Sequence, residues 1–332
     1  MDMTDFDRIP VFSYLVQAAR DLPVPAPVPT VSMDPITLPA LDRGLPLKLR
    51  VTAPATGTEL PIVLISHGGG ASRYIPSRIG YQPLVDFYAA RGFAVVQPTH
   101  LSSRSDGLGL RQDLPGWSLF WRSRIDDFKQ ILDQSEAIEV QAPIVAGRLD
   151  WSRVAIVGHS AGGNTASILL GARGTDPATG EEIDLREPRI SAGVLLASTG
   201  TAEGLSAPIR QRFPELAADF SHMTTRTLVV YGDQDGDPRE TTRGASWHAE
   251  PYHLSPGADA LVTLPGAKHF LGGVMGYDLA ESDDDDPDRL AVTQAVSWAY
   301  LRSALNDGDP AWAKVTAALT DHGGTLANIE TK

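Results

Sequence analysis

A serine between two glycines stands where an apolar segment meets a helical pattern. The motif Gly158-His159-Ser160-Ala161-Gly162 follows the apolar segment Arg153–Val157 and leads into the helical pattern Ala161–Ala172. A serine at such a turn projects its hydroxyl above a sheet, and glycines remove the Cβ atoms that would clash where strand and helix cross. The setting favours Ser160 as a nucleophile over a structural serine in a packing turn.

A serine hydroxyl is a weak nucleophile near neutral pH, so it needs a base, and the base needs an orienting acid. When a parallel sheet carries the serine, the acid and then a histidine follow it along the chain. The apolar segment Ala260–Thr263 is followed by a loop that contains His269, which is therefore the predicted base. The other histidines after Ser160 are His222, His248, His253 and His322.

The remaining histidines receive structural predictions. His248 and His253 precede the last apolar segment, so we expect them at the surface or at the rim of a pocket. His322 falls in the C-terminal tail. His159 is adjacent to the nucleophile, and we expect its side chain to point away from that of Ser160.

Three aspartates follow the apolar segment Thr227–Tyr231, in the order Gly232-Asp233-Gln234-Asp235-Gly236-Asp237. A carboxylate just past the carboxyl end of a parallel strand lies at the edge where ligands bind. Gly232 permits a turn, and Asp235 comes three residues later, so Asp235 is the predicted acid. Asp233 and Asp237 are the alternatives, and otherwise they cap the turn through side-chain-to-backbone hydrogen bonds.

A glycine-rich loop supplies candidate donors for an oxyanion. His67-Gly68-Gly69-Gly70 follows the apolar segment Pro61–Ser66. Acyl transfer needs two backbone N–H groups aimed at the tetrahedral intermediate, and we expect them from Ala161 and Gly69, with Gly70 as second choice. The loop lacks the G-x-x-x-x-G-K-[ST] pattern of phosphate binding, which leaves a flexible glycine turn as the alternative.

Short apolar segments alternate with helical patterns, which predicts an α/β fold: a mostly parallel central sheet of about eight strands with helices on both faces. The two leading strands lack a helix between them and should form an antiparallel hairpin. The predicted strands are Val31–Leu38, Leu47–Ala53, Pro61–Ser66, Ala94–Gln97, Arg153–Val157, Ala192–Ala197, Thr227–Tyr231 and Ala260–Thr263. The predicted helices are Leu84–Arg91, Trp117–Glu139, Ala161–Ala172, Ile209–Ala218, Arg239–Ala249 and Arg289–Leu305.

Two further segments bear on domain organisation. Residues 1–30 are predicted to be an N-terminal extension, in which the proline-rich stretch 21–29 forms an extended strap over the surface. Residues 31–332 should form a single domain. The acidic run at 282–288 is predicted to be a solvated loop at the N-terminus of the last helix, with calcium binding as the alternative.

Composition excludes several classes of function. With 28 basic and 41 acidic side chains and a net charge of −13, the chain should be repelled by nucleic acid and by anionic membranes. The absence of cysteine excludes disulfides, zinc–thiolate sites and a cysteine nucleophile. No apolar run of about 18 residues predicts a membrane span. The acidic N-terminal residues contain no visible signal, so we expect a cytoplasmic protein, or a secreted one if a signal was removed.

The motifs HGGG, GHSAGG, GDQD and GAKHF occur in this order, each after an apolar segment. The chain thereby resembles the α/β-hydrolase superfamily over about residues 30–306. The segments ISHGGGASRYIPSRIGYQPLVDFYAARGFAVVQPTH, WRSRIDDFKQILDQ and LDWSRVAIVGHSAGG are similar to the dienelactone-hydrolase-like and platelet-activating-factor-acetylhydrolase-like branch.

The resemblance implies a serine esterase that cleaves a small-molecule or lipid-like carboxylic ester through an acyl-enzyme intermediate. Ser160, Asp235 and His269 would be the catalytic residues, no metal or organic cofactor would be needed, and no large lid domain would cover the site. The oligomeric state stays open.

The chain departs from relatives of that branch in ways that keep alternatives open. Dienelactone hydrolases use a cysteine nucleophile, which is absent here, and polyester hydrolases usually have methionine where this chain has Ala161. The alternatives are a chlorophyllase-like, phospholipid-acyl or polyester-cleaving hydrolase, a cofactor-free perhydrolase, and a binding module on a hydrolase scaffold.

Residues near the strand ends are candidates for substrate contacts. Gly70 lies in the glycine loop, His100 follows the fourth strand, and Trp117 and Trp121 begin a long helical pattern. All four are predicted to border the substrate, although aromatic residues at helical spacing are more often part of a core. The loop 271–288, which follows His269, could fold over the site.

Overall fold

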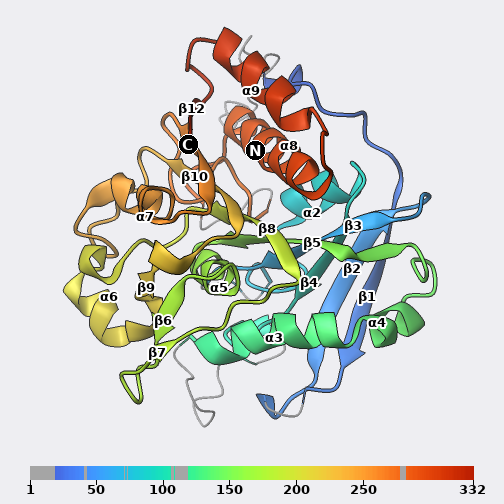
Figure 1. Cartoon of the computed structure of the whole chain (residues 1–332), viewed down its shortest axis with the longest axis horizontal. Coiled ribbons are helices and arrows are strands. Elements are labelled where there is room, and N and C mark those ends of the chain that lie inside the picture. The colour runs from blue at the N-terminus through green and yellow to red at the C-terminus, as the bar shows by residue number, and fades with distance from the viewer. Residues whose placement is uncertain are drawn as a thin grey trace, which may run out of the picture.

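The computed structural model describes residues 19–40, 43–70, 72, 74–105, 108, 119–276 and 282–332. Within these ranges a nine-stranded sheet has the order β1-β2-β4-β3-β5-β8-β10-β11-β12 (Figure 1). Its strands are β1 (Thr30–Leu38), β2 (Leu47–Pro54), β3 (Leu60–Ser66), β4 (Ala94–Pro98), β5 (Leu149–His159), β8 (Ile190–Leu196), β10 (Arg226–Gly232), β11 (Ala258–Leu264) and β12 (Asn328–Thr331). Along this order, the consecutive strands β4, β3, β5, β8, β10 and β11 run parallel to one another. The predicted α/β fold class is therefore confirmed.

The edges of the sheet are antiparallel. β1 and β2 form the expected hairpin, and β2 also runs antiparallel to β4. At the other edge β12 pairs antiparallel with β11, with Val262 opposite Ile329. β12 was not predicted, because its four residues form no apolar run. A separate three-stranded sheet of β6 (Arg173–Thr175), β7 (Glu182–Ile183) and β9 (Ala218–Asp219) was also missed, since its strands are only two or three residues long.

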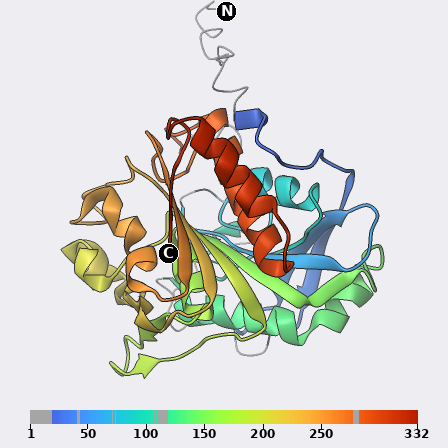
Figure 2. The ribbon, with the colours of Figure 1, turned by 45° about the horizontal axis from the view of Figure 1, so that its top comes forward.

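Helices cover both faces of the sheet, as Figures 1 and 2 show. The helices are α2 (Gln82–Ala89), α3 (Trp121–Asp133), α4 (Ser135–Gln141), α5 (Ala161–Leu169), α6 (Ala207–Arg212), α7 (Glu250–Leu254), α8 (Pro287–Leu305) and α9 (Ala311–Asp321). Alternate side chains of each strand point to opposite faces. In β3, Val63 and Ile65 join the core under α2, α8 and α9, whereas Ile62 and Leu64 join the core under α3, α4, α5 and α7.

The helices differ from their predicted bounds for local reasons. The predicted helix Trp117–Glu139 is divided into α3 and α4 at Gln134, whose φ is −113°. The predicted helix Ile209–Ala218 ends at Arg212, because Pro214 disfavours a helical conformation at the residue before it. The predicted helix Arg239–Ala249 is a 3-10 helix from Gly244, followed by α7. α9 occupies the segment that was expected to be a tail.

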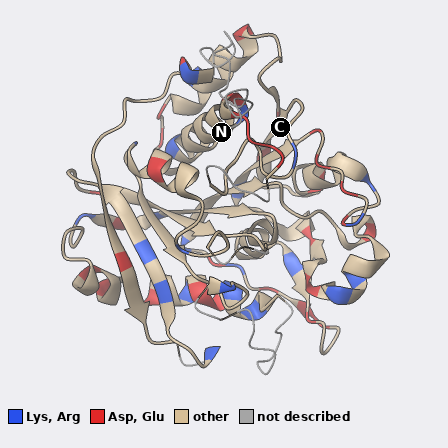
Figure 3. Cartoon of the chain, turned by 180° about the vertical axis from the view of Figure 1, so that it is seen from behind, with Lys and Arg blue, Asp and Glu red and all other residues tan. Residues whose placement is uncertain are grey.

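Charges are mixed over the described part of the chain. In the view of Figure 3, acidic and basic residues are interspersed along the ribbon. Among the described helices, none combines the length and the apolar character that crossing a bilayer requires. The division into an extension of residues 1–30 and a domain of residues 31–332 stays a prediction.

A buried polar network fixes the loops that follow β3 and β4. Asp127 on α3 accepts a hydrogen bond from Arg43 at 2.6 Å and contacts Nδ1 of His100 at 2.8 Å. Burial, together with the nearby guanidinium groups, lowers the pKa of His100, so its neutral ring donates to Asp127. Arg124, also on α3, donates to the backbone carbonyl of His67. α3 thus holds the start of the glycine loop in place.

We predict that Asp127→Asn lowers the free energy of unfolding by about 3–5 kcal/mol, because it leaves the buried Arg43 without its anionic partner. The neighbouring Asp126 pairs with Arg122 at the surface, where the two side chains are 37% and 52% exposed. Asp126→Asn should therefore cost about 0–1 kcal/mol. Urea unfolding of both variants measures the difference, and equal losses would contradict a structural role for the network.

Candidate active site

Ser160 occupies a strained turn between β5 and α5. Its φ is 55° and its ψ is −126°, a conformation that costs an L-residue on the order of 1–3 kcal/mol. The turn is tight because the backbone of α5 lies directly against the strands. A Cβ on Gly158 would come within 2.2 Å of the Gly162 carbonyl oxygen, and a Cβ on Gly162 within 2.0 Å of the Ser66 carbonyl oxygen. The glycines of the motif are therefore required by packing, as the sequence indicated.

Two segments bring backbone amides close to Ser160: the first turn of α5 and the glycine loop after β3. The first amides of α5 that bond within the helix are those of Gly163 and Asn164, which donate to the Ser160 carbonyl. The amide of Ala161 precedes them in the first turn, where N–H groups have no partner inside a helix. On the other side, Gly68 donates its N–H to the Tyr81 hydroxyl at 2.8 Å, so it is committed elsewhere.

Gly69 and Gly70 of the glycine loop line the same cavity as Ser160. A Cβ at Gly69 would meet no other atom within 4 Å, so this position is open toward the cavity. Both predicted donors of the glycine loop, the first and the second choice, are therefore at the site.

The predicted acid and base are hydrogen bonded to each other. His269, in the loop after β11, donates from Nδ1 to Oδ2 of Asp235 at 2.9 Å. Asp235 lies in the turn after β10, and its side chain is only 5% exposed. The alternatives cap turns: Asp233 accepts the amide of Gly266, and Asp237 accepts the amide of Arg239. Of the three aspartates, Asp235 is thus the one brought to His269.

Hydrogen bonding sets the charges of this pair. Burial by itself would raise the pKa of Asp235, but hydrogen bonds from His248 and His269 hold that pKa far below its usual range. Burial by itself would lower the pKa of His269, but the hydrogen bond and the charge of Asp235 raise it above its ordinary value. The carboxylate is therefore ionised and stabilises a proton on the imidazole of His269.

A second histidine contacts the same carboxylate. Nε2 of His248 lies 3.2 Å from Oδ2 of Asp235, and its Nδ1 lies 2.7 Å from the carbonyl oxygen of Ser198. The side chain is 2% exposed and lines the cavity, so the prediction that His248 is a surface or rim residue was wrong about its burial. Sequence reasoning missed it, since it lies in a 3-10 helix outside any motif.

The ligand atoms of Asp235, His248 and His269 all lie within 4.8 Å of one another. Among the described residues, this is the group of three side chains that a metal ion could bridge. The hydrogen bonds already account for the spacing, and we assign no metal to it.

The side chain of His159 connects three loops around the site. Burial, followed by the charge of His269, lowers the pKa of His159 to about 3, so the ring is neutral. Its Nε2 donates to the backbone carbonyl of His269 at 2.8 Å, and its Nδ1 accepts from the Tyr81 hydroxyl at 2.8 Å. Tyr81 in turn accepts from the amide of Gly68. His159 thus links the loop of the base to the glycine loop through Tyr81, a residue that no sequence motif identified.

A cavity of about 370 Å³ joins these groups. Ser160, Ala161 and His269 line it, together with Gly69 and Gly70. Its remaining wall is largely apolar and comes from segments far apart in the chain. The larger apolar side chains that line it are Leu119, Leu205, Ile209, Phe213, Leu216, Trp247, Phe270 and Met275.

Other predicted substrate contacts are placed differently. His100 is fully buried in the network with Asp127 and is absent from the cavity wall, so its prediction as a rim residue was wrong. Trp121 is partly buried against a cluster formed by Leu119, Leu205, Leu216 and Trp247, and it lines a different cavity of about 710 Å³. Trp117 lies outside the described residues.

Part of the loop that follows His269 lies at the candidate site. Met275 lines the cavity, and residues 277–281 lie outside the described residues. Asp284, predicted to be solvated, is instead buried and accepts the amide of Lys268, next to His269. Asp286 caps α8 by accepting the amides of Asp288 and Arg289, as acids at that helix N-terminus were expected to do.

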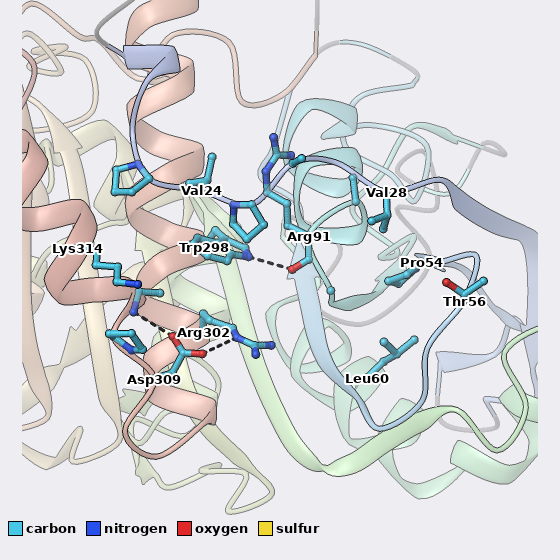
Figure 4. A pocket seen from close by; sticks show the side chains of 17 residues that line it. Val24, Val28, Pro54, Thr56, Leu60, Arg91, Trp298, Arg302, Asp309 and Lys314 are labelled. Atoms are coloured by element: carbon cyan, nitrogen blue, oxygen red, sulfur yellow. Dashed lines mark hydrogen bonds and ion pairs between the residues drawn. The ribbon is translucent and has the colours of Figure 1, made fainter.

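A larger cavity of about 800 Å³ lies away from these groups (Figure 4). It is bordered by the proline-rich residues 23–28 and by residues of α8 and α9. Trp298 there donates to the carbonyl of Arg91, and Arg302 pairs with Asp309. No histidine or serine is among the described residues of its wall, so it lacks the groups for acyl transfer. The cavity at Ser160 is the candidate active site.

Comparison with known proteins finds sequence similarity over part of the chain. No protein-family model matches the chain. The chain is similar to a platelet-activating factor acetylhydrolase of Cavia porcellus, with 29% identity over 147 residues. The matched region covers 35% of this chain and 33% of that protein, so the chain spans about a third of the relative's length.

We predict that Gly162→Ala destabilises the fold by several kcal/mol, because the added Cβ would lie 2.0 Å from the Ser66 carbonyl oxygen. Gly69→Ala is the matched control, since a Cβ there meets nothing within 4 Å and its φ is not positive. Thermal unfolding of the two purified variants compares them. A similar melting temperature for both would mean that the elbow is not closely packed.

Proposed function

We propose that this protein is a serine hydrolase that cleaves a carboxylic ester through an acyl-enzyme intermediate. The observation that carries the proposal is that Ser160, in its strained turn, shares one cavity with His269, which is hydrogen bonded to the buried Asp235. The relative's name describes it as an acetylhydrolase. The similarity to that protein supports the same class of reaction.

In the proposed mechanism His269 acts as base and acid in turn. Its Nδ1–H donates to Asp235, which leaves the lone pair of Nε2 to accept the proton of Ser160. The Ser160 oxygen attacks the carbonyl carbon, and the imidazolium then protonates the leaving alkoxide to give the acyl-enzyme. In the second half, water attacks the acyl group while His269 takes its proton; the imidazolium then returns that proton to the Ser160 oxygen as the acyl bond breaks and the carboxylic acid leaves.

The developing oxyanion would be stabilised by backbone amides. We assign this role to the N–H groups of Ala161 and Gly69, with Gly70 next to them at the cavity. The amide of Gly68 is excluded from the role, because it donates to Tyr81. No step of this mechanism requires a metal or organic cofactor.

The cavity favours an ester with an apolar group. Its wall beyond Ser160 consists largely of aliphatic and aromatic side chains, and such surface binds hydrocarbon rather than charged groups. A small-molecule or lipid-like ester is the proposed substrate class. Chlorophyllase-like, phospholipid-acyl and polyester-cleaving activities, and perhydrolysis by the same three residues, are narrower versions of this proposal.

We predict that Ser160→Ala lowers kcat on a nitrophenyl ester by about 10⁴-fold or more, because the nucleophile is removed. A fluorophosphonate probe should modify the unaltered protein at Ser160, as located by peptide mass spectrometry, and should not modify the variant. The matched control is Ser167→Ala, since Ser167 lies on the same helix and its hydroxyl donates to the Asn164 carbonyl. Undiminished turnover by the Ser160 variant would refute the proposed function.

We predict that Ile209→Trp narrows the cavity and changes chain-length selectivity. Ile209 lines the cavity from α6, so an indole at this position should occupy part of the space for a substrate chain. The kcat/KM for octanoyl esters should fall by about 10-fold or more relative to that for acetyl esters, since loss of a few buried methylene contacts costs this much. Gln211→Trp, an exposed residue of α6, should leave the ratio unchanged. Equal ratios in both variants would place the substrate chain elsewhere.

A further inference from the structure

Two successive peptide groups of the glycine loop have hydrogen-bond partners at three of their four polar atoms. In the peptide group between His67 and Gly68, Arg124 donates to the carbonyl, and the amide donates to the Tyr81 hydroxyl at 2.8 Å. In the next peptide group, the Gly68 carbonyl oxygen lies 2.8 Å from Nδ1 of the His67 ring. The fourth polar group is the amide of Gly69, which donates to no other residue in the described part of the chain.

The partners of the His67 ring determine where its proton lies. Burial lowers the pKa of His67 well below its ordinary value, so the ring is neutral and carries one proton. Its Nε2 accepts the backbone amide of His100 at 3.1 Å, and a ring nitrogen that accepts has no proton of its own. The proton is therefore on Nδ1, which donates it to the Gly68 carbonyl.

Tyr81 connects the glycine loop to two other segments at the site. Burial raises the pKa of Tyr81, so the hydroxyl keeps its proton. Because the hydroxyl oxygen accepts from Gly68, its proton is donated to Nδ1 of His159, 2.8 Å away. The backbone amide of Tyr81 donates to the Met275 carbonyl at 2.8 Å, and its φ is 60°. A positive φ is uncommon for a residue other than glycine and persists where the surrounding contacts hold it.

The two side chains act on a residue that would otherwise be free to change conformation. Without a side chain, Gly68 could adopt a wide range of φ and ψ. A Cβ at Gly68 would lie 3.1 Å from both the Cβ of Ser160 and the Tyr81 hydroxyl, so a side chain there would crowd the turn of the serine. The hydrogen bonds of Tyr81 to its amide and of His67 to its carbonyl therefore select one conformation.

The direction of the Gly69 amide follows from that of the Gly68 carbonyl. The peptide bond between Gly68 and Gly69 is trans, so its C=O and N–H bonds point in opposite directions. The carbonyl points to the ring of His67, which is fully buried, and the amide of Gly69 thus points away from that ring. Since Gly69 lines the cavity together with Ser160, this direction favours the cavity over the interior.

We propose that His67 and Tyr81 are positioning residues that set the conformation of Gly68 and thereby aim the amide of Gly69 at the oxyanion. Both side chains are fully buried and neither lines the cavity, so they act through the backbone of the loop. The inference rests on the proposed function, because an oxyanion forms only if Ser160 attacks a carbonyl. The two residues should then affect the transition state more than the binding of substrate.

The first test is Tyr81→Phe, assayed with a nitrophenyl ester and with its thionoester, in which sulfur replaces the carbonyl oxygen. Amide donors stabilise a developing O⁻ more than a developing S⁻, so the oxygen ester depends more on the aim of Gly69. Its kcat should fall by about 10-fold or more, which is part of the roughly 10²–10³-fold loss when an oxyanion donor is removed. The KM should stay nearly unchanged, and kcat for the thionoester should fall much less.

Tyr88→Phe is the matched control. Tyr88 is as buried as Tyr81 and lies on the helix that follows it, but its hydroxyl donates to Ser297 at 2.7 Å, away from the loop. Each variant loses one buried hydroxyl, so urea unfolding should show similar losses of stability, whereas Tyr88→Phe should keep both turnover rates. Equal losses on ester and thionoester in Tyr81→Phe, or no loss, would contradict the inference.

The second test compares two amide side chains at position 67. Asparagine can present an N–H close to the place of Nδ1, because both nitrogens are bonded to Cγ, whereas the amide of glutamine lies one bond farther out. His67→Asn should therefore retain a higher ratio of ester to thionoester kcat than His67→Gln. Equal ratios in the two variants would mean that the hydrogen bond from Nδ1 does not aim the loop.

A third measurement does not depend on activity. Nitrogen-15 NMR of the unaltered protein at about pH 7 should show the His67 proton on Nδ1 and none on Nε2, with the resonances assigned from their loss in His67→Asn. A proton on Nε2 would overturn the inference whether or not the protein cleaves esters. Undiminished ester turnover in Ser160→Ala would instead overturn the proposed function, so the two failures are distinguishable.

Discussion

The site depends on a backbone contact that permits no side chain. The first turn of α5 lies against the end of β3 so closely that a Cβ on Gly162 would overlap the Ser66 carbonyl. Ser160, directly before this turn, has a positive φ, which is a strained conformation for an L-residue. The contact also brings the N-terminal amides of α5 next to the loop that follows β3. The positions of the proposed nucleophile and of the proposed oxyanion donors thus depend on one packing arrangement.

Hydrogen bonds extend this arrangement to the loop that carries His269, the proposed base. The neutral ring of His159 joins the carbonyl of His269 to Tyr81, and Tyr81 holds the amide of Gly68. A displacement of the glycine loop would therefore also disturb the hydrogen bonds of the loop that carries His269. On the other side of the glycine loop, α3 is connected through Arg124 to the carbonyl of His67. The loop is held from both sides by buried polar groups, which are costly to break and so resist rearrangement.

The apolar wall of the cavity has a different origin from the turn at Ser160 and the glycine loop. It is assembled from side chains of α6, the 3-10 helix that contains Trp247, and the loop that contains Met275. None of these segments carries a motif, and their residues would serve equally well in an ordinary core. Trp247 packs against Gly200 and Gly204, where a Cβ would come within 2.3 Å and 2.1 Å of its atoms. Small residues in one loop thus make room for the indole that borders the cavity.

The sequence by itself determined the α/β class, all eight strands it assigned, the elbow at Ser160 and the pairing of Asp235 with His269 as candidates. These features are encoded locally: apolar runs of strand length alternate with helical patterns, and glycines are required at the turns where chains approach closely. Tertiary structure alone decided that His100 is buried on Asp127, that Asp284 is not solvated, and that His248 reaches Asp235. The physical reason is that the burial and the hydrogen-bond partners of a polar side chain depend on segments far away in the sequence that pack against it. The residue pattern around that side chain does not indicate which segments those are.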